Sequence, residues 1–336
     1  MNNKSNTRRS MPPWKYNLWV GVFFVILFSV FMLIYIATIR IDYTWSWYKV
    51  PSTFVNREVI EISSEIDGKV AQIDRKNDQA VITIGNETES KSYTVPAEDI
   101  RVNQGDLIYY GDTLATYREW RAGIMLQGLW ITLKCSLFAI IFGIIIGIIG
   151  GIARISDNPA LKWSAISYVE LIRGSPLLVQ IFIWYFVLGT MINQLLMSYG
   201  MKEIPSLWYG VASLACFTGA YVTEIVRAGI QSIHRGQTEA ARSLGMTYGQ
   251  CMRYVILPQA MRRILPPLAG QFISLIKDSS LLGIIAVREL LKATREVVTT
   301  QLNPFEMFFT SAALYLVITF SLSMFVQYLE RKTATT

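Results

Sequence analysis

The sequence is poor in the residue types on which many soluble enzymes and secreted domains depend. Only 16% of its 336 residues are charged, and the three cysteines (Cys135, Cys216 and Cys251) are scattered along the chain. None of them falls in the hydrophilic stretch 40–121, so neither a disulfide framework nor a cysteine-based metal site is indicated. The phosphate-binding pattern G-x-x-x-x-G-K-[ST] is also missing. This excludes a Walker-type site through which the chain could use ATP by itself.

Apolar residues are abundant instead and gather in long runs. They make up 52% of the chain, and about 20 consecutive apolar residues suffice for one helix to cross a bilayer. Six runs reach that length: 16–39, 122–153, 174–201, 204–223, 264–287 and 307–329. The first is too long and too aromatic for a cleaved signal peptide, so we expect a retained anchor. The sequence predicts a mostly α, polytopic membrane helix bundle of about six transmembrane helices.

The charges that are present fit a membrane topology better than a nucleic-acid partner. The net charge is +7, and residues 1–15 carry basic side chains without an acidic one. With six spans, lysine and arginine predominate in the segments on the side of the N-terminus, as expected of the cytoplasmic side. We therefore expect a cytoplasmic basic tail (1–15), an anchor (16–39) and a cytoplasmic C-terminal tail (331–336).

The hydrophilic region 40–121 has the pattern of a small β domain outside the membrane. Alternating apolar and polar residues at 59–62, 69–73 and 80–84 are separated by turn-forming residues. Gly105 and Gly111 suit tight turns. The pieces 64–70 and 102–115 resemble the two halves of a lipoyl or biotinyl-type sandwich, although the lysine that such carrier domains modify has no counterpart. We expect no cofactor here, and either an inert spacer or a binding role.

A polar, helix-forming loop at 231–263 precedes the fifth run. Glu239 is expected in the first turn of a short helix (about 238–244) that Gly245 ends in the left-handed conformation. Thr247 and Gln250 have capping-box spacing, so a second helix is expected to run until Pro258 blocks it. The loop is expected to be either a docking surface or a solvated amphipathic connector.

The order of residues in this loop favours docking. Glu239-Ala240-Ala241 is followed, after three further residues, by Gly245 and later by Leu257-Pro258. This arrangement resembles the EAA loop of ATP-binding-cassette (ABC) importer permeases. The resemblance implies that these six residues dock a separate ATPase.

A second stretch narrows the resemblance. Residues 170–180 read ELIRGSPLLVQ and resemble the E-x-x-R-G-T-P-L-L-V-Q signature of polar-amino-acid importers, with Ser175 in place of threonine. Further matches precede and follow the loop, so the resemblance covers about 123–330. It implies a five-helix permease core (122–330) and a substrate pathway that includes Arg173, Gly174, Ser175, Pro176 and Gln180.

Two charged residues interrupt the fifth run near its middle. A charge at the bilayer centre costs roughly 2.5–3.5 kcal/mol on insertion scales unless it faces protein or water. Lys277 and Asp278 are adjacent, so their side chains point about 100° apart and cannot easily pair. We expect both, with Ser279 and Ser280, to line the pathway, where they match the two charges of an amino acid. A buried packing pair is the alternative.

Two other features are expected to be structural. Glu224 and Arg227 lie three residues apart on a helix and can form an ion pair. Gly143, Gly147 and Gly151 recur every four residues and indicate close packing of two helices.

The expected function is that of a permease subunit, not an enzyme. The resemblance implies that it moves polar amino acids across the bacterial inner membrane by alternating access. It also implies three partners: a cytoplasmic ATPase dimer that binds ATP and magnesium, a second permease subunit and an extracytoplasmic solute-binding protein. An ion-gradient transporter or channel would need charges along several spans, and a membrane-anchored adaptor would not need five further spans.

Overall fold

The computed structural model describes residues 12–334 except 77, 87–88 and 98. Most of the predicted basic tail, residues 1–11, therefore lies outside the described part of the chain. The first compact unit ends at Trp47 and contains one long helix, α1 (Pro13–Arg40). Its side chains are almost all exposed, as expected of an apolar helix whose surroundings are lipid.

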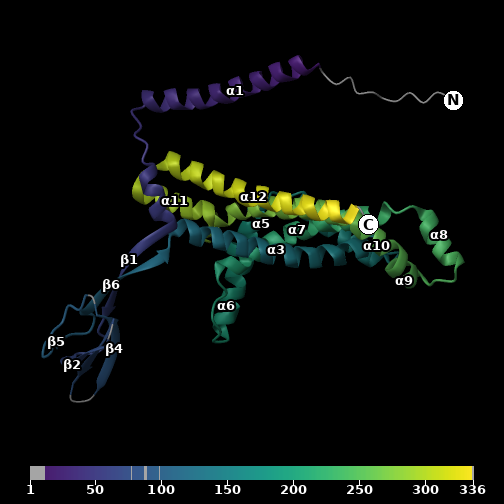
Figure 1. Ribbon diagram of the computed structural model, residues 1–336. Helices are drawn as coiled ribbons and strands as arrows, with labels where there is room; N and C mark the ends of the chain where they lie inside the picture. Colours follow the sequence, from purple (N-terminus) through teal and green to yellow (C-terminus); the bar gives the residue numbers. More distant parts are fainter. Residues whose placement is uncertain (1–11, 77, 87–88, 98, 335–336) are drawn as a thin grey trace. The chain divides into compact units, whose positions relative to one another are not determined.

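The second unit begins at Tyr48, within the short helix η1 (Trp47–Lys49), and continues with α2 (Val50–Phe54) and a β lobe. The lobe strands are β1 (Val55–Ser63), β2 (Gly68–Lys76), β3 (Gln79–Gly85), β4 (Ser90–Pro96), β5 (Leu107–Ile108) and β6 (Thr113–Ala122). Strands β4-β3-β2-β5 form one antiparallel sheet, and β1 pairs with β6 in a separate two-stranded ribbon (Figure 1). All three predicted strands are confirmed.

The lobe has a small apolar core of its own. Alternating residues of β3 (Ala80, Ile82 and Ile84) are fully buried against Val70, and Leu114 at the lobe end of the ribbon joins them. The two predicted turns are confirmed: Gly105 and Gly111 have φ of +95° and +92°. Each precedes an aspartate whose carboxylate accepts a backbone N–H at 2.8 Å. The lobe therefore contains two Gly-Asp turns with the same hydrogen bond.

The rest of the second unit is helical. The first half contains α3 (Ile124–Arg154), α4 (Pro159–Arg173), α5 (Leu177–Phe182), a π-helical stretch η2 (Ile183–Gly189), α6 (Thr190–Ser198) and α7 (Ser206–Gln231). The second half contains α8 (Arg235–Ser243), α9 (Tyr248–Cys251), π-helical η3 (Met252–Ile256), α10 (Leu257–Asp278), 3-10 helical η4 (Ser279–Ile285), α11 (Leu290–Gln301) and α12 (Pro304–Ala334). Because α12 continues to Ala334, residues 331–334 of the predicted C-terminal tail are helical.

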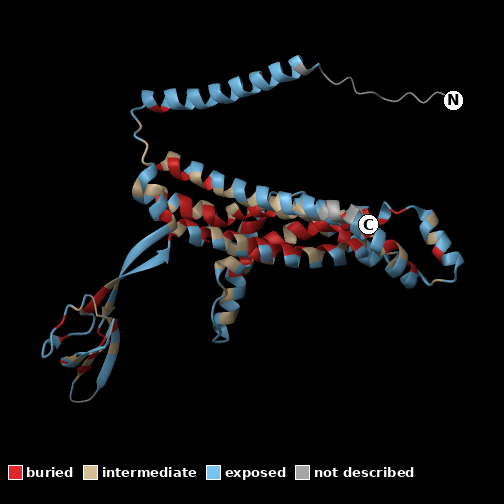
Figure 2. Cartoon of the chain, in the orientation of Figure 1, coloured by how far each residue is buried: buried red, intermediate tan, exposed pale blue. Residues whose placement is uncertain are grey.

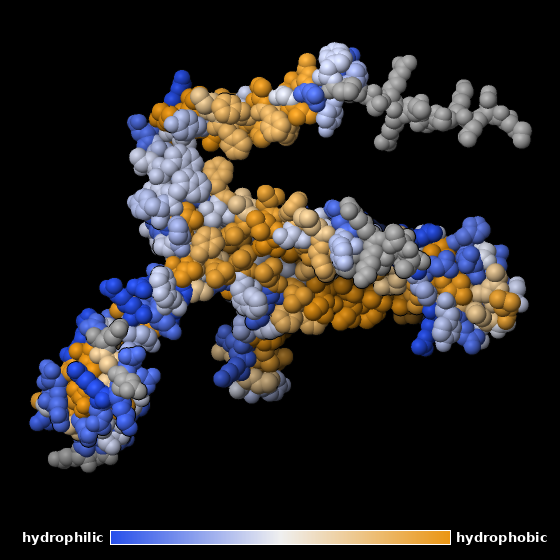
Figure 3. Space-filling view, viewed as in Figure 1, coloured by the Kyte–Doolittle hydropathy of each residue, from blue (hydrophilic) through white to orange (hydrophobic). Residues whose placement is uncertain are grey.

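Six helices of the described chain are long and apolar enough to cross a membrane. They span Trp14–Arg40, Ile124–Arg154, Leu177–Ser198, Ser206–Gln231, Tyr248–Ile285 and Pro304–Tyr328, in agreement with the six predicted runs. On the face shown in Figure 3, apolar side chains cover most of the bundle, whereas hydrophilic ones gather over the loop that contains α8 and over much of the lobe. Helices α4 and α11 were not predicted, because they are short, amphipathic and carry charges.

The central contact of the bundle is the seam between α3 and α7 (Figure 1). The predicted glycine stripe lies on it: a Cβ added at Gly147 would lie 2.3 Å from the Val222 side chain, and one added at Gly151 would lie 2.5 Å from Val226. Such distances are well inside van der Waals contact. The glycines therefore allow the two backbones to approach closely, as predicted.

Candidate functional site

The loop between α7 and α10 is a helical hairpin at one end of the bundle. His234 caps α8, and its Nδ1 accepts a hydrogen bond from the backbone N–H of Gly236 at 3.1 Å. Because α8 starts at Arg235, Glu239 lies in its second turn. The prediction that Glu239 lies in the first turn is therefore wrong, because His234 caps the helix and Arg235 begins it.

The end of α8 is built as predicted. Gly245 follows the helix with φ of +83°, and its N–H reaches the carbonyl of Arg242 at 3.0 Å. An added Cβ at Gly245 would meet no atom within 4 Å. The position therefore needs glycine because of its backbone conformation and not because of crowding.

The second helix starts as predicted but does not stop as predicted. Thr247 and Gln250 form the capping box, with bonds of 3.3 and 2.9 Å. The chain then continues through η3 into α10, and Pro258 lies in the first turn of α10. A proline fits there because its fixed φ is helical and because the π-helical turn before it, in which the Leu257 N–H bonds to the Met252 carbonyl, already departs from the α-helical hydrogen-bond pattern.

The two faces of the hairpin differ sharply. Ala241, with Cys251 and Ile256, is buried against the end of α7 in one apolar cluster. Figure 2 shows most of α8 exposed, and Leu244 at its end is 81% exposed. Glu239 and Ala240 are exposed as well. Ala241 therefore supports the hairpin, whereas Glu239, Ala240 and the unpredicted Leu244 are available to a partner.

The other predicted docking residues lie at the base of the hairpin. Leu257 is half-buried and Pro258 is exposed where η3 meets α10. A cleft of about 770 Å³ separates the hairpin from the bundle, with Asp157, Arg235 and Tyr248 among its lining residues. The hairpin therefore rests on the bundle through its apolar face and a few polar bonds and does not pack along its full length.

An ion-pair network ties the helices together at the same end. The predicted pair is present, with Arg227 Nη2 2.8 Å from Glu224 Oε2. Arg154, at the end of α3, also lies 2.9 Å from Glu224 Oε1 through its Nε. The Arg154 and Glu224 side chains are only 17% and 18% exposed, so solvent screens this pair less than a surface pair. Sequence spacing could not reveal Arg154, because it belongs to another helix.

The 173–180 stretch forms a break between α4 and α5. Helix α4 ends at Arg173, Gly174 follows it, and Pro176 precedes α5. The Gln180 side chain is buried and donates through Nε2 to the carbonyls of Ile172 at 2.7 Å and Ser175 at 3.1 Å, and to Ser175 Oγ at 2.9 Å. Its amide thus occupies the carbonyls that the break leaves unpaired.

The Arg173 side chain extends from this break to α7. Its guanidinium carbon lies 5.1 Å from the ring centroid of Tyr221 in α7, a cation–π geometry. The five predicted pathway residues of this stretch therefore lie around one helix break, where Gln180 has a clear structural task and Arg173 contacts α7.

The 277–280 stretch lies where α10 changes into η4. Asp278 is the last residue of α10 and is half-buried, whereas Lys277 is exposed. Lys277 and Ser280 line a groove of about 290 Å³ beside Ser311 of α12. Ser279 is fully buried and donates to the Ile276 carbonyl at 2.7 Å. The four predicted residues thus have different surroundings.

The two predicted pathway stretches adjoin each other. Ile181 of α5 is buried in one cluster with Leu275 of α10 and Leu282 of η4. Apolar packing therefore connects the helix break at 173–180 with the end of α10. This brings the two stretches, about a hundred residues apart in the sequence, to the same part of the bundle.

Sequence reasoning missed the buried acid Glu289, which lies at the other end of the bundle. Glu289 is fully buried and caps α11, with its carboxylate accepting from the N–H groups of Leu291 and Lys292 at 2.7 Å each and from the Tyr315 hydroxyl at 3.1 Å. Burial raises the pKa of this carboxyl, and the three hydrogen bonds oppose that rise. An acid just before an amphipathic segment was the available signal.

Comparisons with known proteins match part of the chain, and these matches point to one family. The family model described as binding-protein-dependent transport system inner membrane component matches residues 139–335. The probable glutamine ABC transporter permease protein GlnM of Bacillus subtilis (strain 168) is 38% identical over 207 residues, which are 62% of this chain and 92% of the relative. The glutamine transport system permease protein GlnP of Escherichia coli (strain K12) is 36% identical over 209 residues, with the same two shares.

Solved structures show the same relationship. The crystal structure of an amino acid ABC transporter with histidines is 39% identical, with a TM-score of 0.55, and the match covers 62% of this chain and 94% of that one. An inward-facing structure of the MetNI methionine ABC transporter is 21% identical, with a TM-score of 0.52, over 62% of this chain and 95% of that one. The second likeness concerns the fold alone.

Proposed function

Because this chain belongs to the family of binding-protein-dependent transport system inner membrane components, we propose that it imports polar amino acids as the permease subunit of an ABC importer. The relatives named for glutamine match 92% of their own length, and this carries the proposal. The family is a transport family and not an enzyme family, so ATP hydrolysis belongs to a separate subunit. An ion-gradient transporter or a non-transporting adaptor is not favoured, because the relatives are permeases of ABC transporters.

The decisive experiment reconstitutes transport. The permease is co-expressed with the ATPase and solute-binding protein that accompany it and placed in liposomes with ATP inside. We expect uptake of labelled glutamine or another polar amino acid that needs ATP and stops when the ATPase is inactivated. Uptake that follows an ion gradient without ATP would refute the proposal.

The hairpin is the proposed docking surface for that ATPase. We assign the direct contact to the exposed face of α8, with Glu239, Ala240 and Leu244. Gly245, Leu257 and Pro258 set the shape of the hairpin, and Ala241 anchors it on α7. Two copies of the permease, or this chain with a related one, would each present one such surface to an ATPase dimer with bound ATP and magnesium.

The proposed substrate pathway passes the helix break at 173–180 and the end of α10. Asp278 is the proposed contact for a substrate ammonium, because a half-buried carboxylate in a membrane span needs a compensating charge or water. Lys277 and Ser280 line the groove toward α12. We assign Gln180 and Ser279 a structural role, because their hydrogen bonds to backbone carbonyls fix the segments that carry the pathway residues.

The proposed orientation places the hairpin and both termini in the cytoplasm and the β lobe outside. Short basic segments support this assignment. With Cys135, Cys216 and Cys251 replaced by serine, a single cysteine introduced at Asn86 should react with a membrane-impermeant reagent in intact cells, and one at Gln237 should not. The opposite labelling would reverse the orientation.

For the lobe we propose contact with the solute-binding protein or cover over the outer mouth, without a prosthetic group. Its two Gly-Asp turns support the likeness to lipoyl-type domains. Val55 and Ala122 are direct partners at the base of the ribbon, so their Cα atoms lie about 5 Å apart. A short Gly-Ser turn can therefore replace 56–121. We expect this variant to assemble but to need more binding protein for half-maximal uptake; unchanged uptake would make the lobe a spacer.

A further inference from the structure

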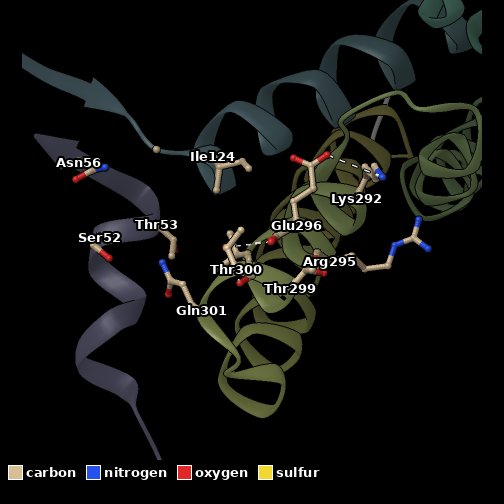
Figure 4. A pocket seen from close by; sticks show the side chains of 12 residues that line it. Ser52, Thr53, Asn56, Ile124, Lys292, Arg295, Glu296, Thr299, Thr300 and Gln301 are labelled. Carbon is tan, nitrogen blue, oxygen red and sulfur yellow. Dashed lines mark hydrogen bonds and ion pairs between the residues drawn. The ribbon is translucent and has the colours of Figure 1, made fainter. Parts of the chain in front are cut away.

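An open cavity of about 670 Å³ lies where the segment before α3 meets α11. Ser52 and Asn56 come from α2 and β1 on one wall (Figure 4). Lys292, Glu296 and Thr300 come from α11 on the other. The volume is within the range of small-molecule sites, about 300–1,000 Å³. The family match begins only at residue 139, so one of the two walls lies outside the part that this chain shares with the family.

The two walls are held together by packed contacts. Val50 and Phe54 of α2 pack against the cluster that contains Leu290 and Met307. The N–H of Gly123 donates to the Phe54 carbonyl at 2.7 Å, and a Cβ added at Gly123 would lie 2.2 Å from the carbonyl oxygen of Thr53. Apolar packing therefore joins α2 to α11, and the Gly123 contacts fix α2 to the start of α3, so the cavity lies between joined elements.

The charged groups of the cavity are of both signs. Glu296 lies 2.8 Å from Arg288 Nε and 4.0 Å from Lys292 Nζ, and Figure 4 shows the Lys292 and Glu296 side chains directed toward each other. Arg295 extends from the same helix away from that pair (Figure 4). The 4.0 Å separation is longer than a hydrogen bond, so the ammonium of Lys292 has capacity for another acceptor.

Groups of both signs, with hydroxyl and amide groups opposite, suit a ligand that has a carboxylate and an ammonium. A simple cation would face Lys292 and Arg295. A simple anion would meet these bases but would leave Glu296 Oε1, which lies 4.0 Å from Lys292 Nζ, without a short ion pair. We propose that this cavity binds a free α-amino acid at the outer end of the bundle, with its carboxylate at Lys292 and its ammonium at Glu296. The choice of ligand rests on the proposed function; the site is distinct from the proposed pathway.

The position of the cavity suggests what occupancy would do. A ligand between α2 and α11 would join the lobe-bearing segment more firmly to α11, whose start is fixed by Glu289 and, through it, by Tyr315 of α12. External amino acid would thereby stabilise the outer end of the bundle without entering the pathway.

The test measures binding to the purified permease–ATPase complex without solute-binding protein and without ATP. Labelled L-glutamine is the probe, and we expect saturable binding that neither butyrate nor butylamine displaces, because each lacks one of the two charged groups. Asn56→Trp, which fills the cavity from the lobe side, and Glu296→Gln, which removes the ammonium partner, should each weaken binding about tenfold or more.

The matched control is Glu58→Gln, which removes a carboxylate from the same segment but outside the cavity. Glu58 is 56% exposed and pairs with Arg121 at 3.3 Å, so its loss should leave glutamine binding unchanged. Absence of saturable binding to the wild-type complex, or wild-type binding by both cavity variants, would overturn the site. Normal ATP-driven uptake in that case would leave the proposed function standing, whereas absence of any amino-acid uptake would refute that function separately.

Discussion

The helical core and the β lobe are stabilised in opposite ways. In the core, α3 and α7 approach so closely that several positions accept only glycine, and helices far apart in the sequence share each buried cluster. The lobe buries a small set of residues from its sheet and from the adjoining end of the ribbon, and it joins the core through the exposed part of the β1–β6 ribbon and α2. Changes to the core should therefore spread through the bundle, whereas changes to the lobe should remain local.

The largest expected effect is that of Gly147→Leu on the seam between α3 and α7. The new side chain would overlap Val222, since even a Cβ would lie 2.3 Å from it, and overpacking costs about 1–3 kcal/mol or more. We expect little monodisperse protein after purification. As a control, Gly270→Ala in α10 meets no atom within 4 Å and should purify normally.

The lobe offers the counterpart of this substitution. A Cβ at Gly68 would lie 2.7 Å from the Gly85 carbonyl oxygen, so Gly68→Leu should disrupt the lobe. Protease digestion should then cut within 56–121 while the core remains intact. If Gly68→Leu also abolished assembly of the core, the two regions would not be independent.

Next in size is Gly245→Val in the hairpin. A left-handed conformation costs a non-glycine residue about 1–2 kcal/mol, so the end of α8 should shift while the spans still insert. We expect ATP-driven uptake to fall strongly and ATPase activity to lose its response to the binding protein. Gly249→Ala, which has open space and lies in α9, is the control. Normal uptake by the Gly245 variant would contradict the docking assignment.

A smaller, selective effect is expected from Asp278→Asn, which keeps the shape and removes the charge. Uptake should fall with assembly and basal ATPase activity retained, and cationic substrates should suffer most. Asp74→Asn in the lobe, where Asp74 accepts from Gln72 at 2.8 Å, removes an equal charge and should leave uptake unchanged. Poor assembly of the Asp278 variant would indicate packing, and unchanged uptake would remove Asp278 from the pathway.

The smallest expected effect is a pH dependence from Glu289. Its pKa in the folded protein is raised above the ordinary 4.5, so between these two values the folded chain binds more protons than the unfolded one. The free energy of unfolding should therefore fall as pH rises through that interval. Relative to Glu289→Gln, the Tm of the wild type should decline from acidic toward neutral pH. A Tm difference that does not change with pH would show that this carboxyl does not titrate differently on unfolding.

Patterns that are local in the sequence determined much of this protein. Apolar runs of sufficient length determined the six candidate spans, because a bilayer requires about 20 apolar residues per helix. Alternation determined three strands, and the φ values of Gly105, Gly111 and Gly245 followed from turn chemistry. The capping box at Thr247 and the Glu224–Arg227 pair also depend only on residues within one turn of helix.

The tertiary structure decided whatever depends on contacts between distant segments. Arg154 joins Glu224 from another helix, and α5 meets the end of α10 through Ile181, which no spacing rule can foresee. Pro258 lies within a continuous helical segment, just after a π-helical turn. The cavity between α2 and α11 arises only where these two helices pack together. Such features depend on which elements are neighbours, and packing free energy settles this for the whole bundle at once.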